Sequence, residues 1–343
     1  MEKKESFMIE IDGSVGEGGG QILRTAIALA AVTGKEVEIE NIRADRPKPG
    51  LSAQHLHAAK AVEKLSGGVI EGLELRSSRL KFSPAELKGF VGEIDIGTAG
   101  SVTLLLQALI PVALFADRET IVRIKGGTDV KWSPPIDFYT NVFIKAIREM
   151  GCDVQIRLKR RGYYPKGGGL VEVRIAPSHH MKGIAFTERE RGGPIKGVSH
   201  SCGLPAHVAK RQAKAAERRL HEYDTAIEIE IEEGGERTTG CGITLWRGYK
   251  SGSAVGARGR RAELVGEEAA RAFLKVSESA STVDVRLADQ LIPYIALADG
   301  KSEMSVREVT GHLETNMYVT KKFLDVEFEI EKGDVFVIRK GGA

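Results

Sequence analysis

The sequence lacks a long hydrophobic run. Its longest apolar stretches, residues 27–32 and 104–116, are shorter than the roughly 20 residues that a membrane-spanning helix needs. The charged start, MEKKE, is unlike a secretory signal, so we expect a cytoplasmic protein with no membrane association. The 343 residues are 42% hydrophobic, which is enough for a large core and favours two domains, or one large domain with an insert.

Cysteine and asparagine are scarce. Cys152, Cys202 and Cys241 lack the paired spacing of a zinc site, so buried or incidental thiols are the favoured interpretation. Asparagine occurs only at positions 41, 141 and 316, while 28% of residues are charged, and this bias is typical of heat-adapted proteins. Because intracellular disulfides are less unusual in such proteins, a disulfide between Cys202 and Cys241 is kept as an alternative interpretation.

Net charge is also small. A value of +3 does not by itself indicate binding to nucleic acid. Basic residues form three local clusters, which are more informative about nucleic-acid binding than the net charge is. The clusters are Arg43, Arg46 and Lys48; residues 157–161; and Arg258, Arg260 and Arg261.

What the sequence does have is a glycine-rich stretch at residues 12–24. A predicted strand at 7–11 runs into these glycines, which open an apolar helix, and such a junction with Arg24 one turn further on can bind phosphate. The stretch lacks the Gly-Lys-Ser/Thr of a P-loop, and Gln21 stands where a dinucleotide fingerprint needs glycine. An ordinary glycine-rich turn remains the alternative. Glu17 favours the phosphate site, because a divalent cation would reconcile its carboxylate with bound phosphates.

A pattern of helices and strands recurs three times along the chain. The first copy has helices at 21–32 and 53–65 and strands at 37–39, 69–75 and 80–82. The second has strands at 93–96, 120–124, 154–158 and 170–175 and helices at 102–115 and 135–150. The third has helices at 290–298 and 313–323 and strands at 304–309, 326–330 and 335–338. Glycines stand at helix starts in every copy, so ligands are expected where those starts converge.

The second and third copies are about twice as far apart as the first and second, which indicates an insert. Residues 182–279 are predicted to form it, with strands at 195–199, 226–232 and 242–246 and helices at 206–222 and 262–275. The expected fold class is α/β (α+β): repeated units form a large domain from residues 1–181 and 280–343, and a smaller α/β domain is inserted.

His312 is the sharpest chemical candidate, because it lies at the first turn of the predicted helix 313–323. A helix N-terminus lowers the pKa of an imidazole, which leaves a neutral nitrogen able to attack phosphorus. A helix-capping or partly buried histidine is the alternative. His55 either binds phosphate or is structural. No role is assigned to His57, His179, His180, His200 or His221; His57, His200 and His221 are expected to face solvent or a strand surface.

Together these motifs resemble the RNA 3′-terminal phosphate cyclase family over nearly the whole chain. They comprise residues 12–13, 16–24, 42–44, 46, 48–51, 54–56, 97, 99–101, 126–129, 134–135, 164–165, 167–169, 289–291 and 312. The resemblance implies three repeated βαβαββ units with a domain inserted after the second. It also implies that ATP adenylates a histidine and AMP passes to an RNA 3′-phosphate. The neighbouring 2′-hydroxyl then closes a 2′,3′-cyclic phosphate while AMP leaves.

The resemblance also implies roles for individual residues. His312 resembles the nucleophile, and Glu17 resembles the carboxylate that holds a divalent metal, Mg²⁺ or Mn²⁺, over the ATP phosphates. Residues matching the groups around the ATP or RNA phosphates are Gln21, Arg24, Arg43, Arg46, Gln54 and His55. Residues matching the nucleotide pocket are Gln107, Pro134, Arg286, Leu287, Ala288, Asp289 and Gln290. Arg286 departs from the family, since many relatives have an aromatic wall of the adenine slot there, opposite a proline.

Two alternatives belong to other functional classes. One is a non-catalytic relative that acts as a binding protein in ribosome assembly, and the presence of His312 argues against it. The other is an enolpyruvyl transferase on the same repeated unit, which has no such insert and uses other catalytic residues. The expected partners are ATP and RNA with a 3′-terminal phosphate. Assembly into a homo-oligomer is kept as an alternative to a monomer.

Overall fold

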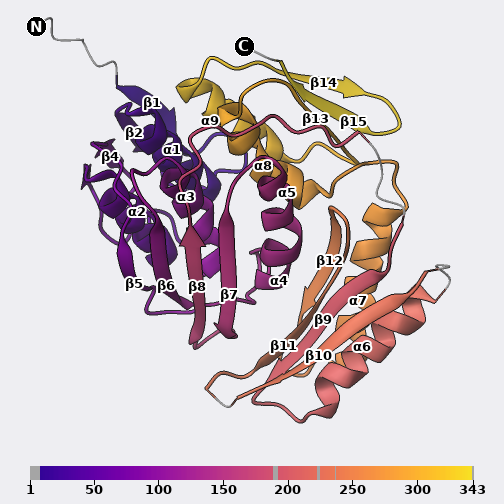
Figure 1. The fold of residues 1–343 in the computed structure, drawn as a ribbon. Coiled ribbons are helices and arrows are strands. Elements are labelled where there is room, and N and C mark those ends of the chain that lie inside the picture. The colour runs from indigo at the N-terminus through magenta and orange to yellow at the C-terminus, as the bar shows by residue number, and fades with distance from the viewer. Residues whose placement is uncertain (1–7, 188–191, 222–224, 236, 342–343) are drawn as a thin grey trace, which may run out of the picture.

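The computed structural model describes residues 8–187, 192–221, 225–235 and 237–341. These residues form four small sheets and a set of helices, so the predicted mixed α/β class is confirmed (Figure 1). Phe7, the first residue of the first predicted strand, lies outside the described residues.

The first two sheets have the same strand order. The first contains β1 (Ile9–Asp12), β2 (Val37–Glu40), β4 (Leu80–Ser83) and β3 (Val69–Glu71), with helices α1 (Gly20–Thr33) and α2 (Ala53–Ser66). The second contains β5 (Val91–Asp95), β6 (Thr120–Gly126), β8 (Gly169–Ile175) and β7 (Val154–Arg160). Its helices are α3 (Val102–Leu114) and a continuous run of α4 (Ile136–Phe138), the π-helix η1 (Tyr139–Phe143) and α5 (Ile144–Glu149). Each sheet begins with a parallel pair and continues with antiparallel strands.

The third sheet has three strands, β13 (Ser302–Val306), β15 (Phe336–Lys340) and β14 (Phe328–Lys332), with helices α8 (Val285–Leu297) and α9 (Gly311–Phe323). Residues 182–186 run parallel to β13: the Glu303 amide donates to the Ile184 carbonyl, and the Phe186 amide donates to the Glu303 carbonyl. In the described residues, the segment beside β13 therefore comes from the start of the predicted insert, residues 182–279, and three complete βαβαββ units remain a prediction.

The insert, defined here as the segment from β9 to α7, has its own sheet. Strands β9 (Ile195–Cys202), β10 (Ile227–Gly234), β11 (Gly240–Arg247) and β12 (Lys250–Val255) pair in the order β10-β9-β11-β12. Helices α6 (His207–Leu220) and α7 (Ala262–Ser277) cover one face and form a separate apolar core with it (Figure 1). The sequence did not indicate β12, whose residues are rich in serine and glycine. Gly252 is needed there, because a Cβ atom would lie 2.2 Å from the Phe273 amide nitrogen of α7.

The main core is built around α1, α3, α8 and α9. Residues 22–31 of α1 are all buried, and so are nearly all residues of α3. A helix that is apolar on every side must be covered on every side, and these four helices pack against one another between the sheets. The starts of α1 and α9 are thereby fixed close together.

No helix among the described residues is long and apolar enough to cross a membrane. Cys152, Cys202 and Cys241 are buried free thiols, so Cys202 and Cys241 are not bonded to each other in this structure. Their burial agrees with the favoured interpretation from the sequence.

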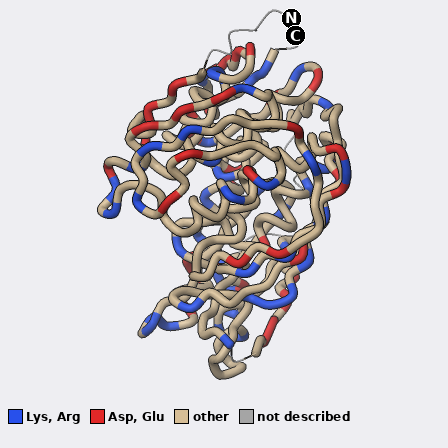
Figure 2. Tube along the Cα trace, turned by 90° about the vertical axis from the view of Figure 1, so that its left-hand side faces the viewer, with Lys and Arg blue, Asp and Glu red and all other residues tan. Residues whose placement is uncertain are grey.

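Basic and acidic segments alternate along much of the trace (Figure 2). Two of the basic clusters are partly neutralised by ion pairs. Lys159 lies 3.0 Å from Glu172, and Arg260 pairs with Glu268. Arg161 is buried among carboxylates. The remaining cluster, around Arg43 and Arg46, lies beside the glycine-rich loop before α1.

Candidate active site

The glycine-rich loop before α1 is the meeting place of three helices. At Gly16, where φ is +65°, a Cβ atom would lie 2.4 Å from Thr315 Oγ1 of α9. At Gly20, the first residue of α1, a Cβ atom would lie 1.8 Å from His55 Nε2 of α2. Both positions need glycine for close approach, and Gly16 also needs it for its left-handed backbone. The loop therefore brings α9 and α2 against the start of α1.

His312 is held at the start of α9 by contacts on both sides. The Thr310 hydroxyl caps the helix by accepting from the Leu313 amide at 3.1 Å, and it donates to Asp289 Oδ1 at 2.6 Å. Gln21 Nε2 donates to the His312 carbonyl at 2.7 Å. The His312 side chain faces Glu17, with Nδ1 3.2 Å from Glu17 Oε2. Because Nδ1 faces the carboxylate, Nε2 is the ring nitrogen left for chemistry.

The surroundings of His312 favour the neutral imidazole. Burial lowers its pKa below the usual 6.5, and the charges of Arg24 and Arg46 lower it further, whereas Glu17 acts in the opposite direction. A neutral ring with Nδ1–H directed at a carboxylate presents a lone pair on Nε2. The site thus supplies a nucleophilic nitrogen at neutral pH.

We expect the His312 imidazole to titrate below 6.5, and the Glu17→Gln substitution to lower its pKa further. The carboxylate stabilises the protonated ring, so removing its charge makes protonation harder. Titration of the imidazole ¹⁵N signals by NMR measures both values. Glu314→Gln, in the first turn of the same helix, is the matched control and should leave the pKa of His312 in place. A pKa of His312 above 6.5, or one indifferent to Glu17→Gln, would contradict this account.

Cationic and polar groups surround the same point. Arg24 is buried, and its Nε donates to Gln107 Oε1 at 3.0 Å. Burial lowers the pKa of Arg24 to about 10, so the guanidinium remains charged at neutral pH. Arg46 Nη2 donates to the Glu17 carbonyl at 3.1 Å. Arg43 has a left-handed backbone, with φ of 57°, and its Nη1 donates to the Gly50 carbonyl at 2.7 Å.

His55 and Gln54 complete this group from the start of α2. His55 Nδ1 lies 2.8 Å from the Ser52 hydroxyl in a capping box, so Nε2 is directed at Gly20. Burial lowers the pKa of His55 well below its usual value, and the charges of Arg24 and Arg43 contribute. Gln54 Oε1 accepts from the Ser101 amide at 3.2 Å, which connects this group to the start of α3.

The residues predicted for the nucleotide are less closely gathered. Asp289 joins the His312 group through Thr310, and burial raises its pKa to about 7. Arg286 is exposed, and its Nη1 donates to the Ser253 hydroxyl of β12 at 2.9 Å. Gln290 Nε2 donates to the Arg286 carbonyl at 3.0 Å, while its buried Oε1 has no hydrogen-bond partner among the described residues. Leu287 and Ala288 have fully buried side chains in the main core. The Pro134 carbonyl accepts from the Thr103 hydroxyl at 2.7 Å.

Contacts therefore join Glu17, Gln21, Arg24, Arg46, Gln107, Asp289 and His312 around the starts of α1 and α9, with Arg43, Gln54 and His55 beside them. Two supporting residues were not singled out from the sequence. Thr310 is the helix cap, a role that threonine before a helix signals. Asn316 Oδ1 accepts from the Thr25 hydroxyl at 2.8 Å and ties α9 to α1.

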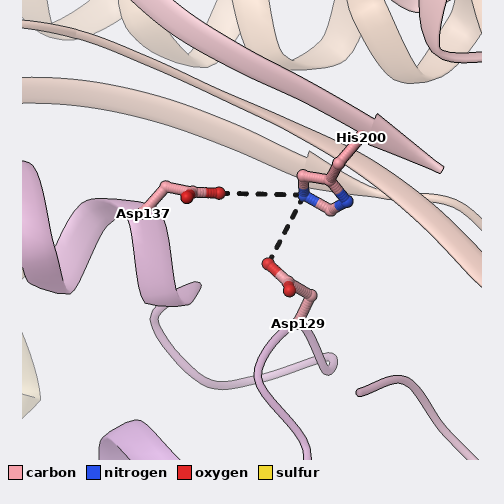
Figure 3. A group of neighbouring side chains, drawn as sticks. All are labelled: Asp129, Asp137 and His200. Carbon is pink, nitrogen blue, oxygen red and sulfur yellow. Dashed lines mark ion pairs between the residues drawn. The ribbon is translucent and has the colours of Figure 1, made fainter. Parts of the chain in front are cut away.

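The prediction for His200 was wrong. It was expected to face solvent or a strand surface, but it is almost fully buried between β9 and the loop and helix that carry Asp129 and Asp137 (Figure 3). The sequence places it on a strand, and the loop after β6 and helix α4 cover the face that it occupies.

Known proteins are similar to this chain over most of its length. The sequence profile of the RNA 3′-terminal phosphate cyclase family matches residues 15–330. The RNA 3′-terminal phosphate cyclase of Archaeoglobus fulgidus is 49% identical over 95% of this chain and 99% of its own length. Those of Pyrococcus furiosus and Methanosarcina mazei are 47% and 45% identical, each over 97% of this chain and over 99% and 100% of their own lengths. A solved enolpyruvyl transferase, NikO from Streptomyces tendae, is 9% identical with a TM-score of 0.22 over 98% of this chain and 82% of that one, a score too low to show a shared fold. From the family match and the identity to these relatives, the chain belongs to the RNA 3′-terminal phosphate cyclase family, a family of enzymes.

Proposed function

We propose that this protein uses ATP to convert the 3′-terminal phosphate of an RNA into a 2′,3′-cyclic phosphodiester, through AMP attached covalently to His312. His312 Nε2 attacks the α-phosphorus of ATP, and the bond to pyrophosphate breaks. An oxygen of the RNA 3′-phosphate then attacks that phosphorus, and the bond to His312 breaks. The 2′-hydroxyl finally attacks the RNA phosphorus, loses its proton, and AMP leaves.

The position of His312 carries this proposal. Its Nδ1 lies 3.2 Å from Glu17 Oε2, which orients the ring and leaves Nε2 free. The ring is half-exposed, at 45% of its side-chain surface, so it can reach a substrate. The partial positive charge at the starts of α9 and α1 favours a phosphate at this point, both before and after attachment to the ring.

The cationic group beside His312 suits the anions of this reaction. Arg24, Arg43 and Arg46 are fixed by hydrogen bonds to other groups, so they are oriented before a ligand arrives. Fixed donors stabilise charge that develops on phosphate oxygens and on departing pyrophosphate. Gln21, Gln54 and His55 add neutral polar groups around the same loop, and we assign all six residues to the ATP and RNA phosphates.

Glu17 fits the divalent cation that ATP brings. Its carboxylate is half-exposed and lies against the start of α9, where a Cβ atom on Gly311 would be 3.0 Å from Oε1. Mg²⁺ is commonly held by one or two carboxylates together with substrate phosphates, so one such group is sufficient. When bound, Mg²⁺ or Mn²⁺ would neutralise phosphate charge.

The test is to incubate the protein with ATP labelled at the α-phosphate. We expect label bound to the protein that is released by acid and stable in alkali, which is the behaviour of a phosphorus–nitrogen bond. A protein that takes up no label, or that holds it in an acid-stable bond, would contradict the proposed intermediate.

We further propose that Arg286 stacks on the adenine in place of an aromatic wall, with Pro134 on the other face. A guanidinium stacks through its plane, which an ammonium lacks. We expect Arg286→Tyr to keep ATP affinity, and Arg286→Lys to weaken it by roughly 1 kcal/mol, about fivefold. Calorimetric titration with ATP measures both. Ser253→Ala is the control, since it removes only the partner of Arg286. An affinity indifferent to Arg286→Ala would remove Arg286 from the pocket.

A further inference from the structure

A second group of ionisable side chains lies where the insert meets the rest of the protein. Asp129 follows β6, Asp137 lies on α4, and Arg161 follows β7; His200 comes from β9 and Glu232 from β10. All except Glu232 are buried. Figure 3 shows His200 directed from its strand toward both aspartates. The contacts described above for the His312 group involve none of these residues.

The guanidinium of Arg161 donates hydrogen bonds to three carboxylates in this group. Arg161 Nη1 donates to Asp129 Oδ2 at 3.2 Å and to Asp137 Oδ2 at 2.9 Å, and Nη2 donates to Asp137 Oδ1 at 3.0 Å. Arg161 Nε donates to Glu232 Oε2 at 2.8 Å. Three carboxylates and one guanidinium leave two excess negative charges, the amount that a single divalent cation cancels. Burying unbalanced charge is costly, although Glu232 is partly solvated.

The carboxylate oxygen without a partner faces the histidine. Asp129 Oδ1 is buried and accepts no hydrogen bond from the described residues. It lies 3.5 Å from His200 Nε2, and Asp137 Oδ2 lies 3.8 Å from the same nitrogen. Both separations are too long for good hydrogen bonds. The 3.5 Å separation matches the spacing between ligands of a tetrahedral ion, about 3.3–3.6 Å for bonds of 2.0–2.2 Å, and the 3.8 Å separation is slightly longer. The three ligand atoms lie within 4.8 Å of one another.

The other side of the imidazole is also arranged as in metal sites. His200 Nδ1 lies 2.6 Å from the Tyr163 hydroxyl. When Nδ1 carries the proton and donates it to that oxygen, the lone pair on Nε2 points at the two aspartates. A histidine that binds a metal usually donates its second N–H in this way, which fixes the ring.

An acidic cavity borders this group. A cavity of about 540 Å³ lies between α4 and the sheet of the insert, and Asp137 and Glu232 are part of its wall. Glu228 and Glu230 line the same cavity, together with one cationic side chain, Lys196. An excess of carboxylates concentrates cations in a cleft. The buried group therefore borders an acidic cavity through Asp137 and Glu232.

We propose that Asp129 Oδ1, Asp137 Oδ2 and His200 Nε2 bind one divalent transition-metal ion that fastens the insert to the large domain. One imidazole and two carboxylate oxygens, close to tetrahedral spacing, suit Zn²⁺. Arg161 remains beside the aspartates: it donates to the other oxygen of each, Asp129 Oδ2 and Asp137 Oδ1, and its Nη1 also donates to the ligand oxygen Asp137 Oδ2. This ion is separate from the one that Glu17 would share with ATP, and its role is structural, because its ligands come from both sides of the contact.

The test uses the full chain, stripped of metal by a chelator and kept free of ATP. We expect calorimetry to show one Zn²⁺ bound, and Co²⁺ in its place to give the visible absorption of a tetrahedral site. Asp129→Asn and His200→Gln should weaken Zn²⁺ binding by at least about 100-fold. Two controls should bind Zn²⁺ as the unsubstituted protein does: His207→Gln, an exposed histidine of the insert, and Glu17→Gln, which separates this site from the one at ATP.

X-ray absorption at the zinc edge of the unsubstituted protein keeps the test independent of whether a variant folds. We expect one imidazole and otherwise oxygen ligands. A spectrum with sulfur ligands or without imidazole would overturn the assignment. So would a stripped protein that takes up no Zn²⁺ or Co²⁺, since the aspartates would then be balanced by Arg161 alone. Zn²⁺ binding unchanged in His200→Gln would overturn it as well.

Discussion

His312→Asn is expected to abolish the labelled AMP adduct, with a loss of at least about 10³-fold in the rate of adduct formation. Removing a covalent nucleophile leaves only binding and charge stabilisation, neither of which creates the missing bond. The substitution should leave the fold unchanged. The Gln21 contact is to the carbonyl of residue 312, and the helix cap is supplied by Thr310, so neither depends on the ring.

The measurement is the time course of protein-bound label from ATP labelled at the α-phosphate, with thermal unfolding as the check on folding. His57→Asn is the matched control: this half-buried histidine on α2 bonds the Ala53 carbonyl through Nδ1 and should label normally. An adduct that still forms at a comparable rate in His312→Asn would show that another residue is the nucleophile. Glu17→Gln should retain some labelling, because Glu17 orients the ring and does not form the bond.

Much of the fold could be predicted because apolar periodicity marks elements that pack on one side. The helix predicted at 313–323 is α9 (Gly311–Phe323), and the helix predicted at 262–275 is α7 (Ala262–Ser277). The strand β12 was missed because Gly252 packs closely against α7 while Ser251 and Ser253 bond Asp284 and Arg286, tertiary contacts that leave no apolar pattern. The pairing of residues 182–186 with β13 was missed because it joins segments more than a hundred residues apart.

Site residues could be predicted from the sequence only where the residues that reveal their role are neighbours in the chain. His312 was recognisable because glycine and a helix start stand beside it in the sequence. The contact between His312 and Glu17, by contrast, depends on how α9 packs against α1, which no local pattern encodes. The prediction for His200 was wrong for a related reason. Its strand has two faces, and only the packing of the large domain against the insert decides which of them is buried.

A strand that ends in a 2′-deoxy nucleotide with a 3′-phosphate should be adenylated but never cyclised. The RNA phosphate attacks AMP on His312 in one step, and the 2′-hydroxyl acts only in the next. That second attack is intramolecular and closes a five-membered ring, for which effective concentrations reach about 10⁵–10⁸ M. Orientation and charge neutralisation by Arg24, Arg43 and Arg46 are then enough to promote it. Without the hydroxyl, the end joined to adenosine through pyrophosphate should accumulate.

The deoxy-ended strand and a matched all-ribose strand are incubated side by side with unlabelled ATP, and the labelled 5′ ends are followed on a gel. The all-ribose strand should pass to the cyclic product. If the deoxy-ended strand is never adenylated, the 2′-hydroxyl is needed for recognition before activation; if it becomes cyclic, the proposed order of steps cannot stand. His312→Asn gives a second check. Supplied with an all-ribose strand that already carries the adenylated phosphate, this variant should still release AMP and form the cyclic end, because the ring has no part in that step.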